Sequence, residues 1–447
     1  MTLKFGTDGV RGVAGVELTV ELTVELARAA VRALGTDEPF LIARDTRRSG
    51  PMLEAALVAG ICAEGGSART LGVLPTPGLA GACVVARAPG AMISASHNPY
   101  PDNGIKLFEP GGRKLRDETE ARIEAELTAL LEVGRVPHEG KGIGTAVPVP
   151  GATGDYVERI VSAVSPDGLR GLRIVADCGN GAAFAAAPRA LEHLGAEVVV
   201  LNATPDGTNI NDGCGSTDPS GLVRTVLEVS AHAGLAFDGD ADRLVAVDER
   251  GGLVDGDHIL AIAALDLQAR GMLRGNAIVT TVMANLGLRR ALAANGITMI
   301  ETPVGDRNVL SAMEEHDLVL GGEQSGHLIF REHAVTGDGP LAGILLLDAV
   351  VRAGAPLSQL AAVVTKYPQI LRNVRVGRRD GLDAAAGFWT EVRAVQRDLG
   401  ADGRVLVRPS GTEPVVRVMV EASDETVATT AADRLTAALL TELGSPS

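Results

Sequence analysis

Short apolar runs alternate with helix-like segments along most of this chain, and that alternation constrains its fold more than any other feature. A turn is expected at 73–78. The expected strands are 39–43, 91–94, 173–177, 196–202, the start of 235–240, 277–283 and 298–303, and the expected helices include 51–64 and about 185–194. Such alternation favours α/β domains with largely parallel sheets.

The length of 447 residues exceeds what one hydrophobic core usually organises, so two to four domains are expected. The stretch 135–152 is rich in glycine and proline, and further boundaries are expected near 250–256 and 366–371. These boundaries predict four domains, at 1–148, 149–252, 253–366 and 367–447.

Composition excludes several classes of protein. Hydrophobic residues make up 46% and charged residues 22%, which is ordinary for a globular chain. Aromatics are only 2% and the net charge is −15, so a nucleic-acid partner is not expected. A phosphorylated small molecule would need local cations, a metal or backbone N–H groups to overcome this acidic field.

The cysteines and the apolar segments indicate the compartment. No pair among the four cysteines has zinc-site spacing, and reduced thiols in the cytoplasm are the expected state of Cys62, Cys83, Cys178 and Cys214. No signal peptide and no apolar run of about 18 residues is visible, so no membrane association is expected.

The first of four chemistry-bearing loops is SASHNPYPDNGIK, at 94–106. It follows a short apolar strand, where open α/β sheets often present reactive groups. Ser96 is a candidate nucleophile, with His97 beside it and Lys106 at the end of the segment, because a serine hydroxyl needs a base or a charge to activate it. The alternative is an Asx/Pro turn with a capping serine.

The second loop is DGDADR, at 238–243. Asp238, Asp240 and Asp242 alternate with small residues, so their carboxylates can converge on a hard cation such as Mg²⁺. Arg243 follows directly and could contact a bound phosphate. A solvated acidic turn is the alternative.

The third loop is GGEQSGH, at 321–327. Glu323 and Ser325 can hydrogen-bond sugar hydroxyls, and His327 could transfer a proton near neutral pH. An ordinary glycine-rich turn is the alternative.

The fourth loop is RPSGTEPVVR, at 408–417. Guanidinium forks, hydroxyls and exposed N–H groups together make an anion site. The residues that would form it are Arg408, Ser410, Gly411, Thr412 and Arg417. A polar hairpin with two surface arginines is the alternative.

Together the four loops supply a nucleophile, a metal site, a hydroxyl-reading loop and an anion site, which are the parts that phosphoryl transfer to a sugar needs. The sequences ASHNP, DGDADR, GGEQSGH and RPSGTEP resemble those of the α-D-phosphohexomutase superfamily. Within it the chain most resembles the bacterial glucosamine-phosphate branch. The resemblance covers nearly the whole chain, through FGTDGVRG (5–12), NINDGCGSTD (209–218), TVMANLG (281–287), PVGDR (303–307) and RPSGTEPVVRVMVE (408–421).

The resemblance implies four domains around a central cleft, three with mixed α/β sheets and a smaller C-terminal α+β domain. It implies that Ser96 carries a phosphate and that one Mg²⁺ is held by a phosphoserine oxygen with Asp238, Asp240 and Asp242. The implied cleft residues near the reacting groups are Arg11, Lys106, Arg243 and His327, beside the adjacent His97. Glu323 and Ser325 match the sugar readers, and the fourth loop matches the clamp on the non-reacting phosphate.

The implied activity interconverts glucosamine 6-phosphate and glucosamine 1-phosphate through a 1,6-bisphosphate, which also serves as activator. It would supply amino-sugar precursor for UDP-N-acetylglucosamine and cell-wall synthesis. The implied partner is a small hexosamine phosphate, and the chain is expected as a monomer or homodimer.

Two residues depart from the superfamily's pattern. Ala241 replaces the usual glycine of the metal loop, which is tolerable if that residue has negative φ. Asp218 stands where histidine is expected after GST. Three rival functions remain open: a phosphogluco- or phosphomannomutase, a catalytically silent sugar-phosphate binding protein, and a metal-dependent hydrolase.

Overall fold

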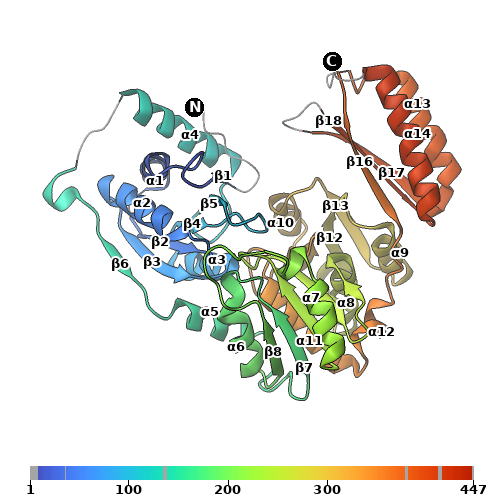
Figure 1. Ribbon diagram of the computed structural model, residues 1–447, viewed down its shortest axis with the longest axis horizontal. Coiled ribbons are helices and arrows are strands. Elements are labelled where there is room, and N and C mark those ends of the chain that lie inside the picture. The colour runs from blue at the N-terminus through green and yellow to red at the C-terminus, as the bar shows by residue number, and fades with distance from the viewer. Residues whose placement is uncertain (1–8, 36, 134–137, 378–380, 411–414, 445–447) are drawn as a thin grey trace. The chain divides into compact units, whose positions relative to one another are not determined.

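The computed structural model describes residues 9–35, 37–133, 138–377, 381–410 and 415–444. The chain forms two compact units, which are described separately below. The first comprises Met1–Met283 and Ile297–Val363, and the second Ala284–Gly296 and Val364–Ser447. Figure 1 labels most of the elements, which are numbered in chain order. Among the described residues, no helix combines the length and the apolar character needed to cross a bilayer.

The first sheet has six strands in the order β1-β5-β4-β2-β3-β6. Its strands are β1 (Val10–Val13), β2 (Phe40–Arg44), β3 (Ala68–Val73), β4 (Gly90–Ile93), β5 (Asp102–Phe108) and β6 (Ala146–Pro148). Its helices are α1 (Val20–Leu34), α2 (Gly50–Ala63), α3 (Thr76–Ala86) and α4 (Asp117–Val133), followed by a 3-10 turn at Gly140–Gly142. One apolar core joins the sheet to α1, α2 and α4 through Leu26, Ile42, Leu53, Ile93 and Ile123.

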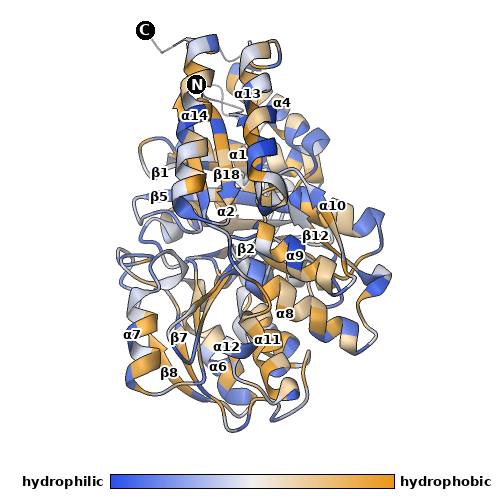
Figure 2. Ribbon diagram, turned by 90° about the vertical axis from the view of Figure 1, so that its right-hand side faces the viewer, coloured by the Kyte–Doolittle hydropathy of each residue, from blue (hydrophilic) through white to orange (hydrophobic). Residues whose placement is uncertain are grey.

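The second sheet has five strands in the order β11-β10-β9-β7-β8. Its strands are β7 (Arg173–Asp177), β8 (Glu197–Leu201), β9 (Ala233–Phe237), β10 (Leu244–Asp248) and β11 (Leu253–Val254). Its helices are α5 (Ala152–Val161), α6 (Ala186–His193) and α7 (Ser220–Glu228), with 3-10 turns at Ala182–Phe184 and Gly215–Thr217. Strands β7 and β8 are mostly hydrophobic, whereas α7 carries both kinds of residue (Figure 2), as a helix with one buried face should.

The third sheet has four strands in the order β13-β12-β14-β15. Its strands are β12 (Ala277–Thr281), β13 (Thr298–Thr302), β14 (Leu320–Gly322) and β15 (Leu328–Phe330). The accompanying helices are α8 (Gly256–Ala269), α10 (Asp306–Glu315), α11 (Gly339–Ala353) and α12 (Leu357–Ala361), with a 3-10 turn at Arg274–Asn276.

The second unit is built on a three-stranded antiparallel sheet in the order β16-β18-β17. Its strands are β16 (Gln369–Arg375), β17 (Gly403–Pro409) and β18 (Val415–Ala422). Its helices are α9 (Leu286–Ala294), α13 (Ala386–Leu399) and α14 (Glu425–Leu443), with a 3-10 turn at Gly400–Asp402. This is the expected smaller α+β unit.

The expectation of largely parallel sheets is only half right, because each sheet of the first unit mixes both directions. Parallel pairs join β2 to β3 and β4, β7 to β8 and β9, and β12 to β13 and β14. Antiparallel pairs join β4 to β5, β9 to β10 and β14 to β15. Their connections are too short for a crossover, which forces the antiparallel direction. The first three chemistry-bearing motifs lie at these three antiparallel connections. The fourth lies at the antiparallel connection from β17 to β18.

Candidate active site

Ser96 lies in the connection from β4 to β5, with φ at 51° and only 1% of its surface exposed. Its Oγ donates a hydrogen bond of 2.5 Å to Asp238 Oδ2, in the connection from β9 to β10. Its own N–H donates to Ser94 Oγ at 2.9 Å. The candidate nucleophile of the first sheet therefore faces the acidic loop of the second.

The three aspartates of that loop form a buried carboxylate cluster. One oxygen from each of Asp238, Asp240 and Asp242 lies within 4.8 Å of the others. Asp240 Oδ1 and Asp242 Oδ1 are buried and accept no hydrogen bond from the described residues. Burial and the two neighbouring carboxylates raise the pKa of Asp238 well above its usual value. Unshared oxygens in such an acidic cluster fit a hard cation.

Besides Ser96, two residues of the first domain contact the cluster. Lys106 Nζ in β5 donates to Asp240 Oδ2 at 2.6 Å and lies 3.7 Å from Asp242 Oδ2. Thr76 Oγ1 at the start of α3 donates to the same Asp240 oxygen at 2.5 Å. Burial opposes the charge of Asp242, but Lys106, His327 and Arg243 together hold its pKa well below the usual range.

His97 and Arg243 lie beside the serine. His97 Nδ1 is 3.4 Å from Ser96 Oγ and 3.2 Å from Arg243 Nη1. Burial, followed by the charges of Arg243 and Arg11, lowers the pKa of His97. Arg11 lies in β1 opposite Gly104 of β5. At neutral pH the His97 ring is therefore uncharged, with Nδ1 as an acceptor towards the arginine.

His327 ends the turn between β14 and β15. Its Nδ1 lies 3.6 Å from Asp242 Oδ2, and its Nε2 lies 3.6 Å from Asp306 Oδ2. Burial opposes protonation, but hydrogen bonding to Asp242 gives the pKa of His327 a net upward shift. The Gly337 N–H donates to Nε2 at 3.0 Å, which requires that Nε2 carries no proton. We therefore place the ring proton on Nδ1, facing Asp242.

The other two sugar-loop candidates lie in the same turn. Glu323 Oε1 accepts a hydrogen bond of 3.1 Å from the Gly305 N–H, which ties this turn to the PVGDR segment. Ser325 is exposed, and its Oγ lies 3.5 Å from Glu323 Oε2. Both polar groups remain accessible to a ligand.

The fourth motif belongs to the second unit. Arg408 in β17 pairs directly with Arg417 in β18. Among the described residues no carboxylate is paired with the Arg408 guanidinium, and burial together with the charge of Arg417 lowers the pKa of Arg408. Like charges opposite each other in a sheet are destabilising, so a bound anion would relieve this pair. Ser410 is buried, while Gly411 and Thr412 lie outside the described residues.

Ala241 corrects one expectation. Its φ is +56°, not negative, so a glycine would be less strained there. The left-handed conformation costs an alanine about 1 kcal/mol. Its methyl group is fully buried, which returns about 0.8 kcal/mol. The two effects nearly cancel, which explains why alanine is acceptable at this position.

Asp218, the other departure, accepts a hydrogen bond of 3.1 Å from the Ser220 N–H at the start of α7. Hydrogen bonding from Ser220 lowers its pKa. A carboxylate here accepts a hydrogen bond from an N–H of the first helical turn, and the positive end of the helix dipole stabilises its negative charge.

Sequence reasoning missed three residues that border the site: Thr76, Arg47 and Asn211. Thr76 stood in a segment interpreted only as a turn. Arg47 and Asn211 donate to backbone carbonyls of the Ser96 loop. Such contacts leave no residue pattern in the sequence, although Asn211 lies within the NINDGCGSTD segment.

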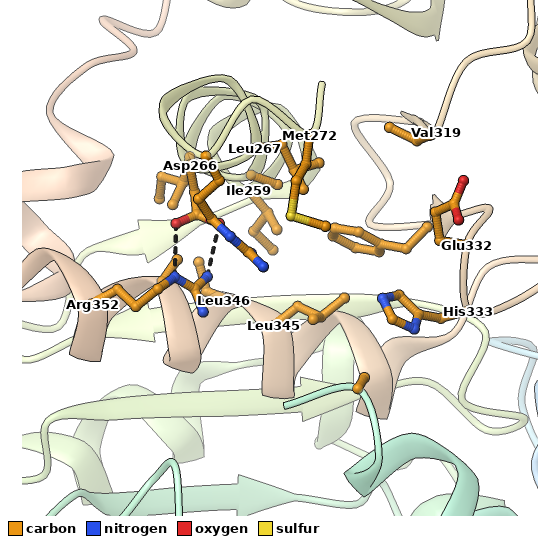
Figure 3. Close-up of a pocket in the computed structure, with 16 residues that line it drawn as sticks. Ile259, Asp266, Leu267, Met272, Val319, Glu332, His333, Leu345, Leu346 and Arg352 are labelled. Carbon is orange, nitrogen blue, oxygen red and sulfur yellow. Dashed lines mark hydrogen bonds and ion pairs between the residues drawn. The ribbon is translucent and has the colours of Figure 1, made fainter. Parts of the chain in front are cut away.

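A separate pocket lies between α8 and α11 (Figure 3), lined by apolar side chains such as Ile259, Met272 and Leu346. Arg352 Nη2 and Asp266 Oδ2 form an ion pair of 2.7 Å on its wall. None of its lining residues belongs to the four motifs. Its described lining holds no serine, threonine or cysteine and no cluster of three carboxylates, so it is not the candidate active site.

Comparison with known families decides the classification. Family models described as phosphoglucomutase/phosphomannomutase domains I, II and III, each alpha/beta/alpha, match residues 2–133, 154–252 and 255–367. The C-terminal domain of the same family matches residues 371–438. The chain belongs to the phosphoglucomutase/phosphomannomutase family.

Members of the family resemble the chain over its full length. A protein of Desulforudis audaxviator named phosphoglucosamine mutase is 50% identical, covering 97% of each chain. One of Symbiobacterium thermophilum with the same name is 51% identical, covering 95% of this chain and 96% of its own. A phosphoglucomutase/phosphomannomutase family protein of Burkholderia thailandensis matches in structure with a TM-score of 0.80 at 26% identity, over 98% of this chain and 97% of its own.

Proposed function

We propose that this enzyme is a phosphoglucosamine mutase that interconverts glucosamine 6-phosphate and glucosamine 1-phosphate. The observation that carries its chemistry is the 2.5 Å contact of Ser96 Oγ with a cluster of three buried carboxylates. The choice of sugar is supported by full-length relatives of that name at about half identity.

The proposed reaction has two phosphoryl transfers. In the first, the bond from phosphorus to Ser96 Oγ breaks while one forms to the free hydroxyl of the sugar phosphate. The product is glucosamine 1,6-bisphosphate. The sugar hydroxyl loses a proton and the released Ser96 Oγ gains one, and the second transfer reverses this exchange. After the intermediate reorients, Ser96 Oγ accepts its other phosphate. The result is the isomeric monophosphate and a regenerated phosphoserine. The same bisphosphate, added as activator, can load an unphosphorylated Ser96.

Asp238, Asp240 and Asp242 would hold one Mg²⁺ together with a phosphoserine oxygen. The buried oxygens of Asp240 and Asp242 that accept no hydrogen bond support this assignment. A divalent cation there supplies charge neutralisation for the transferring phosphoryl group.

The surrounding cations and histidines have proposed roles in charge and proton transfer. Neutral His97 has its acceptor Nδ1 3.4 Å from Ser96 Oγ. Once Arg243 turns from this nitrogen to phosphate oxygens, Nδ1 can take up and return a hydroxyl proton there. Arg243 and Arg11 lie near enough to His97 to depress its pKa, and we assign them to phosphate oxygens. Lys106 stabilises the carboxylates, and His327 orients Asp242.

The sugar and its second phosphate would be held by the other two motifs. Glu323 and Ser325 are assigned to the sugar hydroxyls at C3 and C4. Arg408, Ser410, Gly411, Thr412 and Arg417 are assigned to whichever phosphate is not reacting. The cytoplasm is the proposed compartment, in keeping with four cysteines that are free thiols. A monomer or homodimer remains the expected assembly.

Arg408→Ala should raise KM by about 10- to 150-fold, because a charge-assisted contact contributes about 1.5–3 kcal/mol to binding. It should not lower the thermal stability, because it removes repulsion with Arg417. Arg372→Ala is the matched control, since that arginine of the same sheet is ion-paired with Asp433 at 3.1 Å. An unchanged KM in Arg408→Ala would remove this residue from the clamp.

The substrate assignment predicts the highest kcat/KM for glucosamine phosphate, lower activity with glucose phosphate and least with mannose phosphate. A site rarely rejects a close isostere by more than a few kcal/mol unless polar groups are left unpaired, so some activity with glucose phosphate is expected. The measurement compares kcat/KM for the three sugars, each with its 1,6-bisphosphate activator. A higher value for glucose or mannose phosphate would assign the enzyme to the rival branch.

A further inference from the structure

The main chain of the Ser96 loop is held by side chains from two different domains. Ser96 has a left-handed backbone, which residues other than glycine seldom adopt without support. Its carbonyl oxygen accepts two hydrogen bonds, one from Arg47 Nη2 and one from Asn211 Nδ2, both of 2.9 Å. The Asn98 carbonyl accepts from the same two groups, at 2.8 and 3.1 Å.

Arg47 is the donor from the first domain. Its side chain is fully buried, and its Nε contacts Asp45 Oδ2 at 2.9 Å. The same Asp45 oxygen accepts from Ser94 Oγ at 2.6 Å, and Ser94 Oγ in turn accepts from the Ser96 N–H. Arg47 Nη1 donates to the Pro99 carbonyl at 2.5 Å. The guanidinium is thus directed at the backbone of the loop, not at a ligand.

Asn211 is the donor from the second domain. It lies between β8 and α7 in a left-handed conformation, with φ at 57°, and its N–H donates to the Gly179 carbonyl at 2.9 Å. Two carbonyl acceptors face the side-chain amide, which fixes its NH₂ group towards the loop. Its Oδ1 is buried and accepts no hydrogen bond from the described residues. The amide is therefore kept in this place by its two bonds to Ser96 and Asn98.

We propose that Asn211 is a positioning residue for phosphoryl transfer, which with Arg47 fixes the Ser96 backbone in both phosphorylation states. This inference rests on the proposed function. When Ser96 Oγ carries a phosphate it can no longer donate to Asp238, so that contact is lost once in every cycle. The bonds to the carbonyl are independent of the phosphate. They let the phosphate leave from and return to one fixed oxygen, as effective positioning requires.

The test uses Asn211→Gly, because glycine takes a positive φ without strain while the substitution removes the side chain that carries the amide. Asn209→Gly is the matched control. It also adds a glycine to this segment, but the Asn209 side chain hydrogen-bonds to Thr204 and Asp206 and to no part of the Ser96 loop that the structure describes. In Asn211→Gly, kcat and the single-turnover rate of transfer from phosphoserine should fall about 10- to 100-fold, because small misplacements of reacting groups have effects of that size. KM should stay within about twofold, as expected when only the transition state is affected.

Asn211→Asp provides a second variant of almost equal shape. It turns the donor into a charged acceptor against two carbonyls, so it should be impaired at least as much as Asn211→Gly. Equal loss of kcat in Asn211→Gly and Asn209→Gly would assign the effect to the segment and overturn the inference. So would transfer at the wild-type rate in both Asn211 variants.

Hydrogen–deuterium exchange separates this inference from the proposed function. Asn211→Gly should speed exchange of the peptide covering 94–100, whereas Asn209→Gly should not. Unchanged exchange there would refute the positioning role of Asn211 even if the enzyme is a mutase. A wild-type protein that transfers no phosphate to any hexose phosphate would contradict the proposed function. The exchange result alone would still decide whether Asn211 holds the Ser96 loop.

Discussion

Ser96→Ala should lower kcat/KM by about 10³-fold or more, the scale on which removing an enzyme's nucleophile acts. The proposed cycle has no step without the Ser96 oxygen, and the alanine variant retains the Arg47 and Asn211 contacts to the backbone carbonyl. The loop should therefore keep its place while the chemistry is lost. Phosphopeptide mapping measures the loss of the phosphorylated residue, and steady-state assays measure the loss of activity.

Thr76→Val is the matched control, because it also removes one hydroxyl that donates to the carboxylate cluster. This variant should still be phosphorylated on Ser96 and should lose far less activity. Phosphate on a residue other than Ser96, or substantial turnover by Ser96→Ala, would contradict the assignment of Ser96 as the nucleophile.

Asp240→Asn should lower kcat by about 100-fold or more. Substituting a residue that only hydrogen-bonds to a metal ligand already lowers metal affinity or activity by about 10- to 100-fold. Asp240 is itself a proposed ligand, and it also accepts a hydrogen bond of 2.6 Å from Lys106. For the wild-type enzyme, EDTA should abolish activity and Mg²⁺ should restore it. Metal titration followed by activity assays makes this measurement.

Asp218→Asn makes the same chemical change outside the cluster and should leave the metal requirement as it is in the wild type. Full activity of the wild-type enzyme in a rigorously metal-free preparation would contradict the metal assignment.

Much of the local structure follows from the sequence because the strands are short, apolar and bounded by turns. The expected strand 173–177 is β7 residue for residue, and the expected helix 51–64 is α2 shifted by one position. Too many strand pairs were predicted to be parallel, because an apolar run alone does not determine whether the next strand pairs with it in the antiparallel direction. The short loops after β4 and β9 do determine it, since they are too short for a crossover.

The candidate site was predictable where it depends on side-chain chemistry and not where it depends on backbone geometry. Ser96 and the three aspartates stood out by residue type and spacing, and they do meet. Contacts to main-chain carbonyls, such as those of Arg47 and Asn211, depend on how two domains pack. The sign of φ at Ala241 depends on the turn formed between β9 and β10. Neither can be derived from a residue pattern alone.

The most direct test of the central claim follows labelled phosphate from the protein. The enzyme is labelled with ³²P on Ser96, freed of excess donor, and mixed with glucosamine 6-phosphate and Mg²⁺ in a single turnover. The account predicts that the label leaves Ser96 and appears in glucosamine bisphosphate and monophosphate, with scarcely any inorganic phosphate. Label that stays on the protein in the presence of sugar, or leaves chiefly as inorganic phosphate, would contradict it.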